Sequence, residues 1–299
     1  MNIKAWIQAF RLRTLPLAFS CIFMGAFTAG IDGYFDGVIL TWSLITTLFL
    51  QILSNLANDY GDASSGVDGE QRTGPKRTVS SGLITKGQMK KALYVFSFLS
   101  LASGIYLIWL SFGHQWTKVL VFLVLGLGAI AAAIKYTVGK RPYGYVGLGD
   151  FFVLIFFGLV GVGGNYFLYA NALDLLVVLP ALSCGFLAVG VLNVNNIRDI
   201  ESDKASGKSS IPVRIGRQKA ILYHWFLIIG SVVTMLAYCV IKDLSVGAYL
   251  FLLVSPMLFF NARAVKIKTT SEGLDPYLKQ LALTTLLFVL LFGIGELLF

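Results

Sequence analysis

The segment Val38–Ala57 reads V-I-L-T-W-S-L-I-T-T-L-F-L-Q-I-L-S-N-L-A, carries no charged residue and runs directly into N-D-Y-G-D at residues 58–62. An uncharged apolar stretch of this length is typical of a helix that crosses the hydrocarbon core of a bilayer. The same order of features recurs at Leu175–Leu192, which is soon followed by N-N-I-R-D at residues 195–199. The sequence therefore predicts membrane-spanning helices that end in clusters of amide and carboxylate side chains.

The composition of the whole chain agrees with this interpretation. The 299 residues are 57% hydrophobic and 13% charged, and the charged share is about half that of an average soluble protein. This composition excludes a soluble fold and predicts an all-α integral membrane protein with nine transmembrane helices. The predicted spans are Leu15–Gly30, Val38–Ala57, Ala92–Phe112, Trp116–Ile134, Val146–Tyr169, Leu175–Leu192, Ile221–Ile241, Leu244–Phe260 and Leu281–Phe299.

We interpret residues 1–299 as one domain with two similar halves, whose motifs lie at residues 55–68 and 192–203. Ahead of the first span, apolar residues recur at helical spacing, as expected for a short amphipathic helix at the membrane surface. The first span is expected to be retained, because no A-x-A-like cleavage site follows it. The three cysteines lie in apolar stretches without CxxC spacing, which argues against a disulfide framework or a thiolate metal site.

The distribution of basic residues between the two sides of the membrane tests the predicted number of spans. With nine spans, 22 of the 24 Lys and Arg residues fall on one side of the membrane, and only Lys118 and Lys242 fall on the other. Basic residues accumulate in cytoplasmic loops, so the net charge of +9 does not indicate a nucleic-acid partner. We predict a multi-pass protein of the cell membrane, with the N-terminus and the basic loops cytoplasmic and the C-terminus outside.

Acidic residues are concentrated in two of the cytoplasmic loops, after the second and sixth spans. If the helices continue past the apolar spans, Asn58 and Asp62 share one helix face, and so do Asn195, Asp199 and Asp203. Carboxylate and amide oxygens from two helix ends form a site for a hard cation, and without His or Cys beside them Mg²⁺ is favoured.

Basic residues interleave with these acids. Mg²⁺ completes its coordination shell with water and substrate phosphate, and Arg and Lys side chains neutralise the remaining phosphate charge. Carboxylates and cations at the mouth of an apolar bundle together indicate a site for a lipid diphosphate. The candidate phosphate-binding residues are Arg72, Lys76, Arg77, Arg198, Lys204, Lys208 and Arg214.

The loop after the fourth span lies on the same predicted face. Lys135 and Tyr136 are interpreted either as an anchor pair at the membrane interface or as substrate contacts. The segment Pro142–Asp150 is either a tight turn or one wall of an acceptor site. In the second case Tyr143 or Tyr145 offers an aromatic face, and Lys140 or Arg141 offers a cation for an acceptor carboxylate.

The two aspartate-rich motifs, N-D-Y-G-D-A-S-S-G-V-D at 58–68 and N-N-I-R-D-I-E-S-D at 195–203, resemble those of the UbiA-type intramembrane prenyltransferases. The resemblance covers essentially the whole chain. It implies nine transmembrane helices around a central cavity, with cytoplasmic loops over its mouth. The first motif has Gly66 where many relatives carry a third aspartate, and Asp68 is the candidate ligand in its place.

Other segments are most similar to the branch of this family that prenylates 1,4-dihydroxy-2-naphthoate in menaquinone synthesis. They are R-L-R-T-L-P at 11–16, which contains the candidate substrate-binding residue Arg13, S-S-G-L-I-T at 80–85, P-Y-G-Y-V-G-L-G-D at 142–150, and D-K-A-S-G-K-S-S-I-P-V-R-I-G at 203–216.

This resemblance implies a mechanism. Mg²⁺ bridges the diphosphate of an all-trans polyprenyl donor, the diphosphate departs, and the aromatic ring attacks the allylic cation with loss of CO₂. The implied metal ligands are Asn58, Asp62, Asp68, Asn195, Asp199 and Asp203, and Asp62, Asp199 and Lys135 are the candidate catalytic residues. Two alternatives remain at this stage: a sister enzyme for 4-hydroxybenzoate, homogentisate, haem or chlorophyllide, and a secondary transporter.

Overall fold

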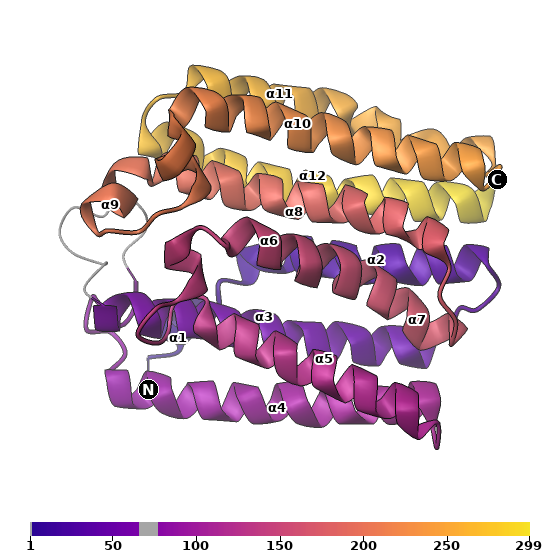
Figure 1. Ribbon diagram of the computed structural model, residues 1–299, viewed down its shortest axis with the longest axis horizontal. Coiled ribbons are helices and arrows are strands. Elements are labelled where there is room, and N and C mark those ends of the chain that lie inside the picture. Colours follow the sequence, from indigo (N-terminus) through magenta and orange to yellow (C-terminus); the bar gives the residue numbers. More distant parts are fainter. Residues whose placement is uncertain (1, 66–76) are drawn as a thin grey trace.

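The computed structural model describes residues 2–65 and 77–299, and the described part is helical throughout, without a strand (Figure 1). The elements are α1 (Ile3–Phe10), η1 (Leu12–Thr14), α2 (Leu15–Ile31), α3 (Gly37–Ser65), α4 (Lys86–Phe112), α5 (Trp116–Lys135), η2 (Tyr143–Val146), α6 (Gly149–Val153), η3 (Leu154–Gly164), α7 (Asn165–Ala170), η4 (Leu175–Val177), α8 (Val178–Arg198), α9 (Ile200–Ala205), α10 (Ile211–Ile241), η5 (Val246–Val254), α11 (Ser255–Ile267) and α12 (Ser271–Leu298).

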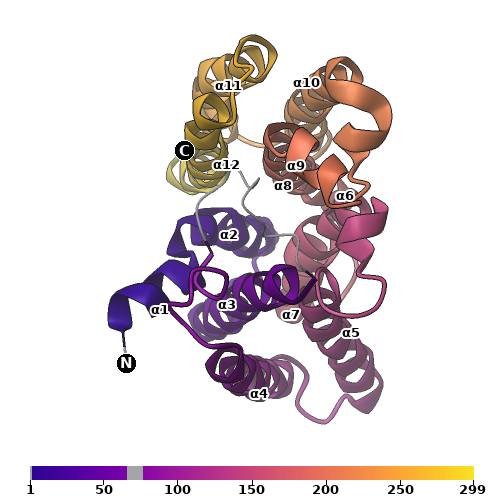
Figure 2. The same cartoon turned by 90° about the vertical axis from the view of Figure 1, so that its left-hand side faces the viewer.

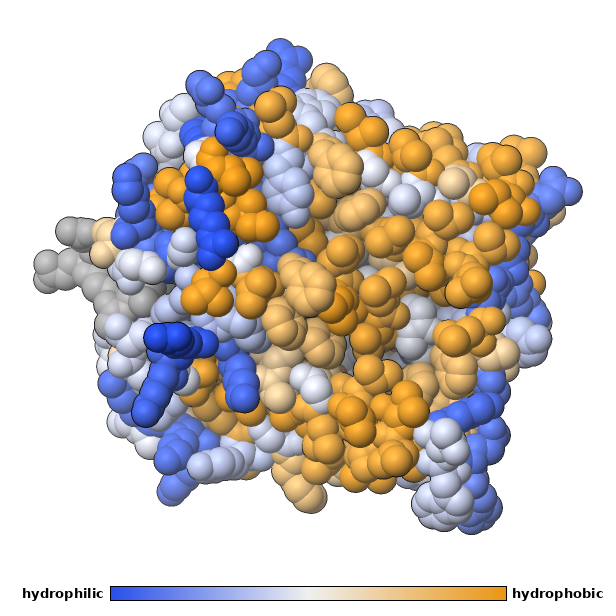
Figure 3. Space-filling model, in the orientation of Figure 1, coloured by the Kyte–Doolittle hydropathy of each residue, from blue (hydrophilic) through white to orange (hydrophobic). Residues whose placement is uncertain are grey.

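The predicted membrane architecture is confirmed. Within the described residues, nine helical segments are long and apolar enough to cross a bilayer. Hydrophobic residues form a broad band across the middle of the molecular surface, and hydrophilic residues gather toward its two ends (Figure 3). A bilayer offers no partners to backbone N–H and C=O groups, which is why each span satisfies these groups within its own helix.

Helices α2 and α8 lie in the middle of the bundle. Seen end-on, α4 and α5 lie on one side of them, and α10 and α11 lie on the other (Figure 2). Helix α2 has ten buried residues, whereas α5 has none. Small residues allow the inner helices to approach closely: a Cβ atom on Gly158 of the π-helix η3 would lie 2.7 Å from the Ala181 carbonyl oxygen of α8.

The two motif-bearing helices end differently. Helix α3 runs without a break to Ser65, so Asn58 and Asp62 share one helix face as predicted. Helix α8 ends at Arg198, and Asp199 leaves the helical conformation before α9 begins at Ile200. The uninterrupted helix that would align Asn195, Asp199 and Asp203 is therefore broken at Asp199, the first carboxylate of the three.

A polar cluster ties the loops at the opposite end of the bundle. The Lys242 ammonium lies 2.9 Å from Asp32 and 2.8 Å from Asp174, and the Tyr166 hydroxyl donates to the other oxygen of Asp32. These side chains come from the ends of α2, α10 and η3–α7 and from the turn before η4. Lys242 is one of the two basic residues that the charge distribution assigned to this side.

The predicted orientation is tested by cysteine labelling in intact cells. Ser81→Cys lies at an exposed position at the end that carries the two motifs, and Ala172→Cys lies at an exposed position at the other end. A membrane-impermeant maleimide is expected to label Ala172→Cys, whereas Ser81→Cys reacts only after permeabilisation. The native cysteines are buried and serve as the unlabelled background. The reverse labelling pattern would contradict the cytoplasmic assignment of the basic loops.

Candidate active site

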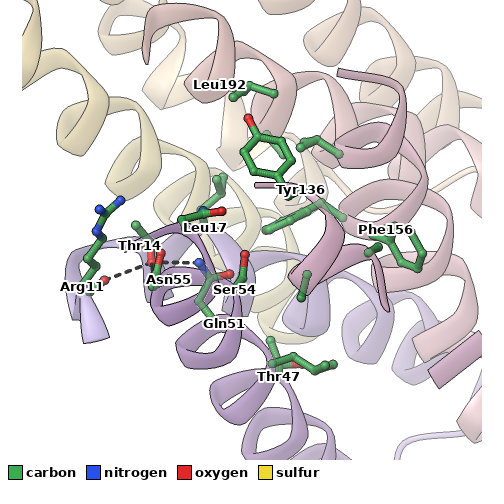
Figure 4. A pocket seen from close by; sticks show the side chains of 18 of the residues that line it. Arg11, Thr14, Leu17, Thr47, Gln51, Ser54, Asn55, Tyr136, Phe156 and Leu192 are labelled. Atoms are coloured by element: carbon green, nitrogen blue, oxygen red, sulfur yellow. Dashed lines mark hydrogen bonds between the residues drawn. The ribbon is translucent and has the colours of Figure 1, made fainter. Parts of the chain in front are cut away.

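A cavity of about 870 Å³ opens among the helix ends that carry the two motifs and continues between the helices. Its mouth is lined by carboxylates, amides and cations from α3, α8 and the loops that follow them. Its deeper walls are mostly apolar and come from α2, α4, α5, η3, α8 and α12. Figure 4 shows two sides of the cavity: Thr14, Gln51 and Ser54 on one, and Tyr136, Phe156 and Leu192 on the other.

The first motif presents Asn58 and Asp62 to the mouth of the cavity. Asp62 is 5% exposed, and each of its oxygens has a partner: Tyr145 donates its hydroxyl hydrogen to Oδ1, and the Arg77 guanidinium pairs with Oδ2. Arg77 also donates to the backbone carbonyl of Asn58. A buried carboxylate is stable only when paired and hydrogen-bonded, and Asp62 meets both conditions.

Asp59, which lies between Asn58 and Asp62 in the sequence, positions the Arg77 guanidinium. Its carboxylate accepts hydrogen bonds from the Thr78 amide at 3.0 Å, the Thr78 hydroxyl at 2.6 Å and the Val79 amide at 3.2 Å. These bonds fix the loop directly after Arg77 against α3. Helical spacing grouped Asp62 with Asn58 and assigned no role to Asp59, whose contacts with Thr78 and Val79 are visible only in the structure.

The second motif is paired through its own arginine. Arg198 donates to both oxygens of Asp199, at 2.8 and 2.7 Å, and to the Asn195 amide oxygen at 2.9 Å. Its third nitrogen donates to Asp275 of α12 at 2.6 Å. The Arg198 side chain is 4% exposed, so its charge depends on these carboxylates. Asp275 was not predicted, since no motif marks it.

Asp203, the third acid of the second motif, binds two residues of the loop that follows α9. Lys208 lies 3.1 Å from Asp203, and the Ser210 hydroxyl donates to the same carboxylate at 3.3 Å. Burial raises the pKa of the Asp203 carboxyl, and the neighbouring Lys208 ammonium opposes this shift. Asp203 and Lys208 both line the cavity mouth, as the sequence predicts.

The donor set at the mouth fits a hard cation. Asn58, Asp62, Asn195, Asp199 and Asp203 all line one cavity and offer only oxygen ligands, which suits Mg²⁺. Within the described residues, three or more acidic, His or Cys side chains do not converge on one point. This arrangement remains compatible with Mg²⁺, which commonly takes one or two carboxylates and completes its shell with water and substrate phosphates.

The segment between α5 and α6 forms part of the cavity wall through Tyr136 and Tyr143, two of the predicted substrate-binding residues, whereas Tyr145, Lys140 and Arg141 are outside the described lining. Tyr136 lines the cavity, and burial together with the carboxylates of Asp150 and Asp62 raises the pKa of its hydroxyl. Tyr143 also touches the cavity, but its ring stacks on Phe152 with centroids 4.0 Å apart. Tyr145 holds Asp62 and lies outside the lining.

Three predicted cations lie away from the cavity. Lys135, Arg141 and Lys204 are exposed and are absent from the described lining. Arg214 binds backbone and side-chain oxygens of the neighbouring loops, including the Val146 carbonyl at 2.6 Å. Asp68, Arg72 and Lys76 lie outside the described residues.

The junction of α1 and α2 adds a polar wall to the site, on which Gln51 and Asn55 were not predicted from the sequence. The Thr14 hydroxyl accepts hydrogen bonds from Gln51 at 2.9 Å and from Asn55 at 3.1 Å, and all three residues line the cavity (Figure 4). Arg13, a predicted substrate-binding residue, lies on the same wall, 3.8 Å from Asp275. The signal was available: Gln51 and Asn55 precede Asn58 at helical spacing.

Comparison with known proteins gives a consistent result. The model of the UbiA prenyltransferase family matches residues 18–283. The 1,4-dihydroxy-2-naphthoate octaprenyltransferase of Escherichia coli is 44% identical to this chain, covering 98% of this chain and 94% of the relative. The protein of that name from Haemophilus influenzae is 42% identical, with coverages of 98% and 96%.

Solved structures agree on the fold. The apo structure of a UbiA homolog from Aeropyrum pernix has a TM-score of 0.70 at 17% identity, covering 97% of this chain and 98% of that chain. A UbiA homolog from Archaeoglobus fulgidus bound to GPP and Mg²⁺ has a TM-score of 0.60 at 16% identity, with coverages of 96% and 99%. At this level of identity the likeness supports the fold alone.

The close contact between α3 and the segment after α5 gives a stability prediction. A Cβ atom on Gly61 would lie 2.5 to 2.7 Å from the hydroxyl and backbone of Thr137. We expect Gly61→Ala to lower the thermal stability of the detergent-solubilised protein, because such crowding in a packed region costs about 1–3 kcal/mol. The control is Gly128→Ala in α5, where a Cβ atom meets open space and a small gain is expected. Equal melting temperatures for the two variants would contradict the tight contact.

Proposed function

Because the chain belongs to the UbiA prenyltransferase family, we propose that it transfers a polyprenyl group from an all-trans polyprenyl diphosphate to 1,4-dihydroxy-2-naphthoate, releasing diphosphate and CO₂. The product is demethylmenaquinol, an intermediate of menaquinone biosynthesis. The observation that carries this proposal is a mouth of paired acids and cations above an apolar cavity, in a chain 42–44% identical to naphthoate octaprenyltransferases over nearly its whole length. This family membership favours a transferase over the transporter alternative.

The donor's diphosphate is assigned to the mouth of the cavity. Asn58, Asp62, Asn195, Asp199 and Asp203 would hold Mg²⁺ there. When bound, Mg²⁺ supplies positive charge that stabilises the departing diphosphate as a Lewis acid. The cavity-lining cations Arg77, Arg198 and Lys208 now pair with carboxylates, and the same groups form charge-assisted hydrogen bonds to phosphate oxygens.

The deeper cavity is assigned to the prenyl chain. Its walls include Phe122, Leu125, Phe156 and Val160, which bury an apolar chain and exclude water from the allylic carbon. Loss of the diphosphate leaves an allylic cation, and exclusion of water prevents its capture as an alcohol. The ring of Tyr136 also lines the cavity, near enough to Asp62 for that carboxylate to act on its hydroxyl, and an aromatic face stabilises positive charge.

The acceptor is assigned to the polar wall of the α1–α2 junction. A naphthoate is a flat anion with two hydroxyl groups and needs a cation and hydrogen-bonding groups away from the diphosphate cluster. Arg13, Gln51 and Ser54 offer these groups within the cavity, and the ion pair of Arg13 found among the described residues is a long one, 3.8 Å to Asp275. Attack of the ring carbon on the allylic cation forms the new carbon–carbon bond, and the ring carboxylate leaves as CO₂.

The metal assignment predicts the effect of removing one carboxylate charge. Asp62→Asn and Asp199→Asn are expected to lower prenyl transfer by on the order of 100-fold or more, since charge at the departing group contributes several kcal/mol. Excess EDTA is expected to abolish turnover of the wild type, and added Mg²⁺ to restore it. Glu201→Gln, an exposed change between the same motif residues, should retain near-normal activity. Wild-type turnover in EDTA would refute the metal assignment.

The acceptor assignment predicts a selective change in KM. We expect Arg13→Gln to raise the KM for 1,4-dihydroxy-2-naphthoate by roughly tenfold, because a hydrogen bond to a charged group contributes about 1.5–3 kcal/mol, with a smaller change in the KM for the prenyl diphosphate. Arg141→Gln is the matched control, because Arg141 is exposed and lies outside the cavity. A larger increase in the naphthoate KM for Arg141→Gln than for Arg13→Gln would indicate that the acceptor binds at the loop between α5 and α6 instead.

The identity of the acceptor is tested directly with a substrate panel. Purified protein, Mg²⁺ and a polyprenyl diphosphate are incubated with 1,4-dihydroxy-2-naphthoate, 4-hydroxybenzoate or homogentisate, and product formation and CO₂ release are measured. The naphthoate is expected to be the best acceptor. Faster prenylation of 4-hydroxybenzoate would refute the choice of acceptor but leave the prenyltransferase proposal in place.

A further inference from the structure

A second hollow lies on the outside of the bundle, between α10 and α11. It has a volume of about 380 Å³ and is lined by Trp225, Phe259, Arg263, Lys266 and Ile267. None of these residues lines the central cavity. The four α11 residues follow one another at spacings of four, three and one, so they share one helix face. We call this hollow the α10–α11 groove.

The basic side chains of the groove are available to a ligand. Arg263 and Lys266 are both exposed, and the ion pairs found within the described residues do not include them. Because the groove lies near the end of α11 that faces the predicted cytoplasmic side, the two charges stand at the level of the lipid headgroups.

The walls of the groove are held in place. Arg217 of α10 donates hydrogen bonds to the backbone carbonyls of Val265, at 3.0 Å, and Lys268. These bonds join the beginning of α10 to the end of α11, directly beside the groove. A cation at the last carbonyls of a helix also stabilises the helix terminus. The two helices that flank the groove are therefore joined at this end.

The opposite end of the groove is aromatic and apolar. The rings of Trp225 and Phe259 meet edge to face, with centroids 5.5 Å apart. Large apolar side chains are exposed on either side of them, among them Leu222, Phe226 and Phe260, on the part of the surface that faces lipid. The general excess of Lys and Arg in cytoplasmic loops does not explain why two of these charges lie next to an aromatic pair. The groove is polar and basic at the headgroup level and apolar below it.

We propose that the α10–α11 groove binds an anionic glycerophospholipid. Its phosphate lies between Arg263 and Lys266, and an acyl chain lies along Trp225 and Phe259. Basic pockets between transmembrane helices on the cytoplasmic side match anionic headgroups, and an aromatic pair at this depth matches the interface between headgroups and acyl chains. A free phosphate would use only the cations, and a zwitterionic lipid would bring its own positive charge beside them. The proposal is independent of the prenyl-transfer reaction.

The test measures lipid retention by the full-length protein. Delipidated, detergent-purified protein is titrated with phosphatidylglycerol and with phosphatidylcholine of the same acyl chains, and bound lipid is counted by native mass spectrometry. The wild type is expected to retain phosphatidylglycerol preferentially. The double variant Arg263→Gln/Lys266→Gln should weaken this retention about tenfold or more, because two cations near an anionic headgroup are removed. Each single variant is expected to show a smaller loss.

The matched control is Lys86→Gln/Lys90→Gln, which removes two exposed cations from the start of α4 on the same predicted face. This control should retain phosphatidylglycerol like the wild type. Equal losses in both double variants, or equal retention of the two lipids by the wild type, would overturn the proposal. Displacement by inorganic phosphate at the same concentration would identify an ion site instead, and preferential retention of a polyprenyl diphosphate at Arg263 and Lys266 would identify a substrate site.

Discussion

A charge that is buried inside the bundle must be paired, and the structure at the mouth of the cavity depends on this constraint. Taking a carboxylate or a guanidinium out of water costs several kcal/mol unless an opposite charge and hydrogen bonds compensate. Asp62, Asp199 and Asp203 are each met by a basic side chain within the described residues. The long apolar helices can therefore end in acidic clusters without leaving those acids uncompensated, and the loops that supply the cations are fixed as a consequence.

The same pairing prepares the site for its ligand. A diphosphate, like a carboxylate, offers anionic oxygens that Arg and Lys bind by charge-assisted hydrogen bonds, so a cation that holds a carboxylate is already placed and desolvated for phosphate. Arg77, Arg198 and Lys208 line the cavity from three different segments. A ligand that arrives with its own cations can exchange partners with these pairs without leaving any charge unpaired. Preorganised charge of this kind reduces the reorganisation needed when the leaving group departs.

The acids of the two motifs are paired with their arginines in different ways. Asp62 takes its arginine from a loop that Asp59 fixes by three hydrogen bonds. Asp199 takes its arginine from the preceding residue, and Asp275 of α12 binds the other side of that guanidinium. The sequence echo between residues 58–62 and 195–199 thus describes where the acids lie, whereas the surrounding contacts are not symmetric.

The sequence by itself determined the nine spans, the side on which basic residues gather, and the oxygen-rich ends of α3 and α8. These features follow from apolar length, charge and helical spacing, which are local properties of the chain. Only the tertiary structure decided which partners hold the buried charges: Tyr145 and Arg77 hold Asp62, and Asp275 holds Arg198. It also decided that Tyr143 stacks on Phe152 while Lys135 and Arg141 stay exposed. Gln51 proved to belong to the cavity wall. Most of these contacts join residues far apart in the chain, and a side chain's partner there depends on how the helices pack rather than on any spacing that the sequence displays.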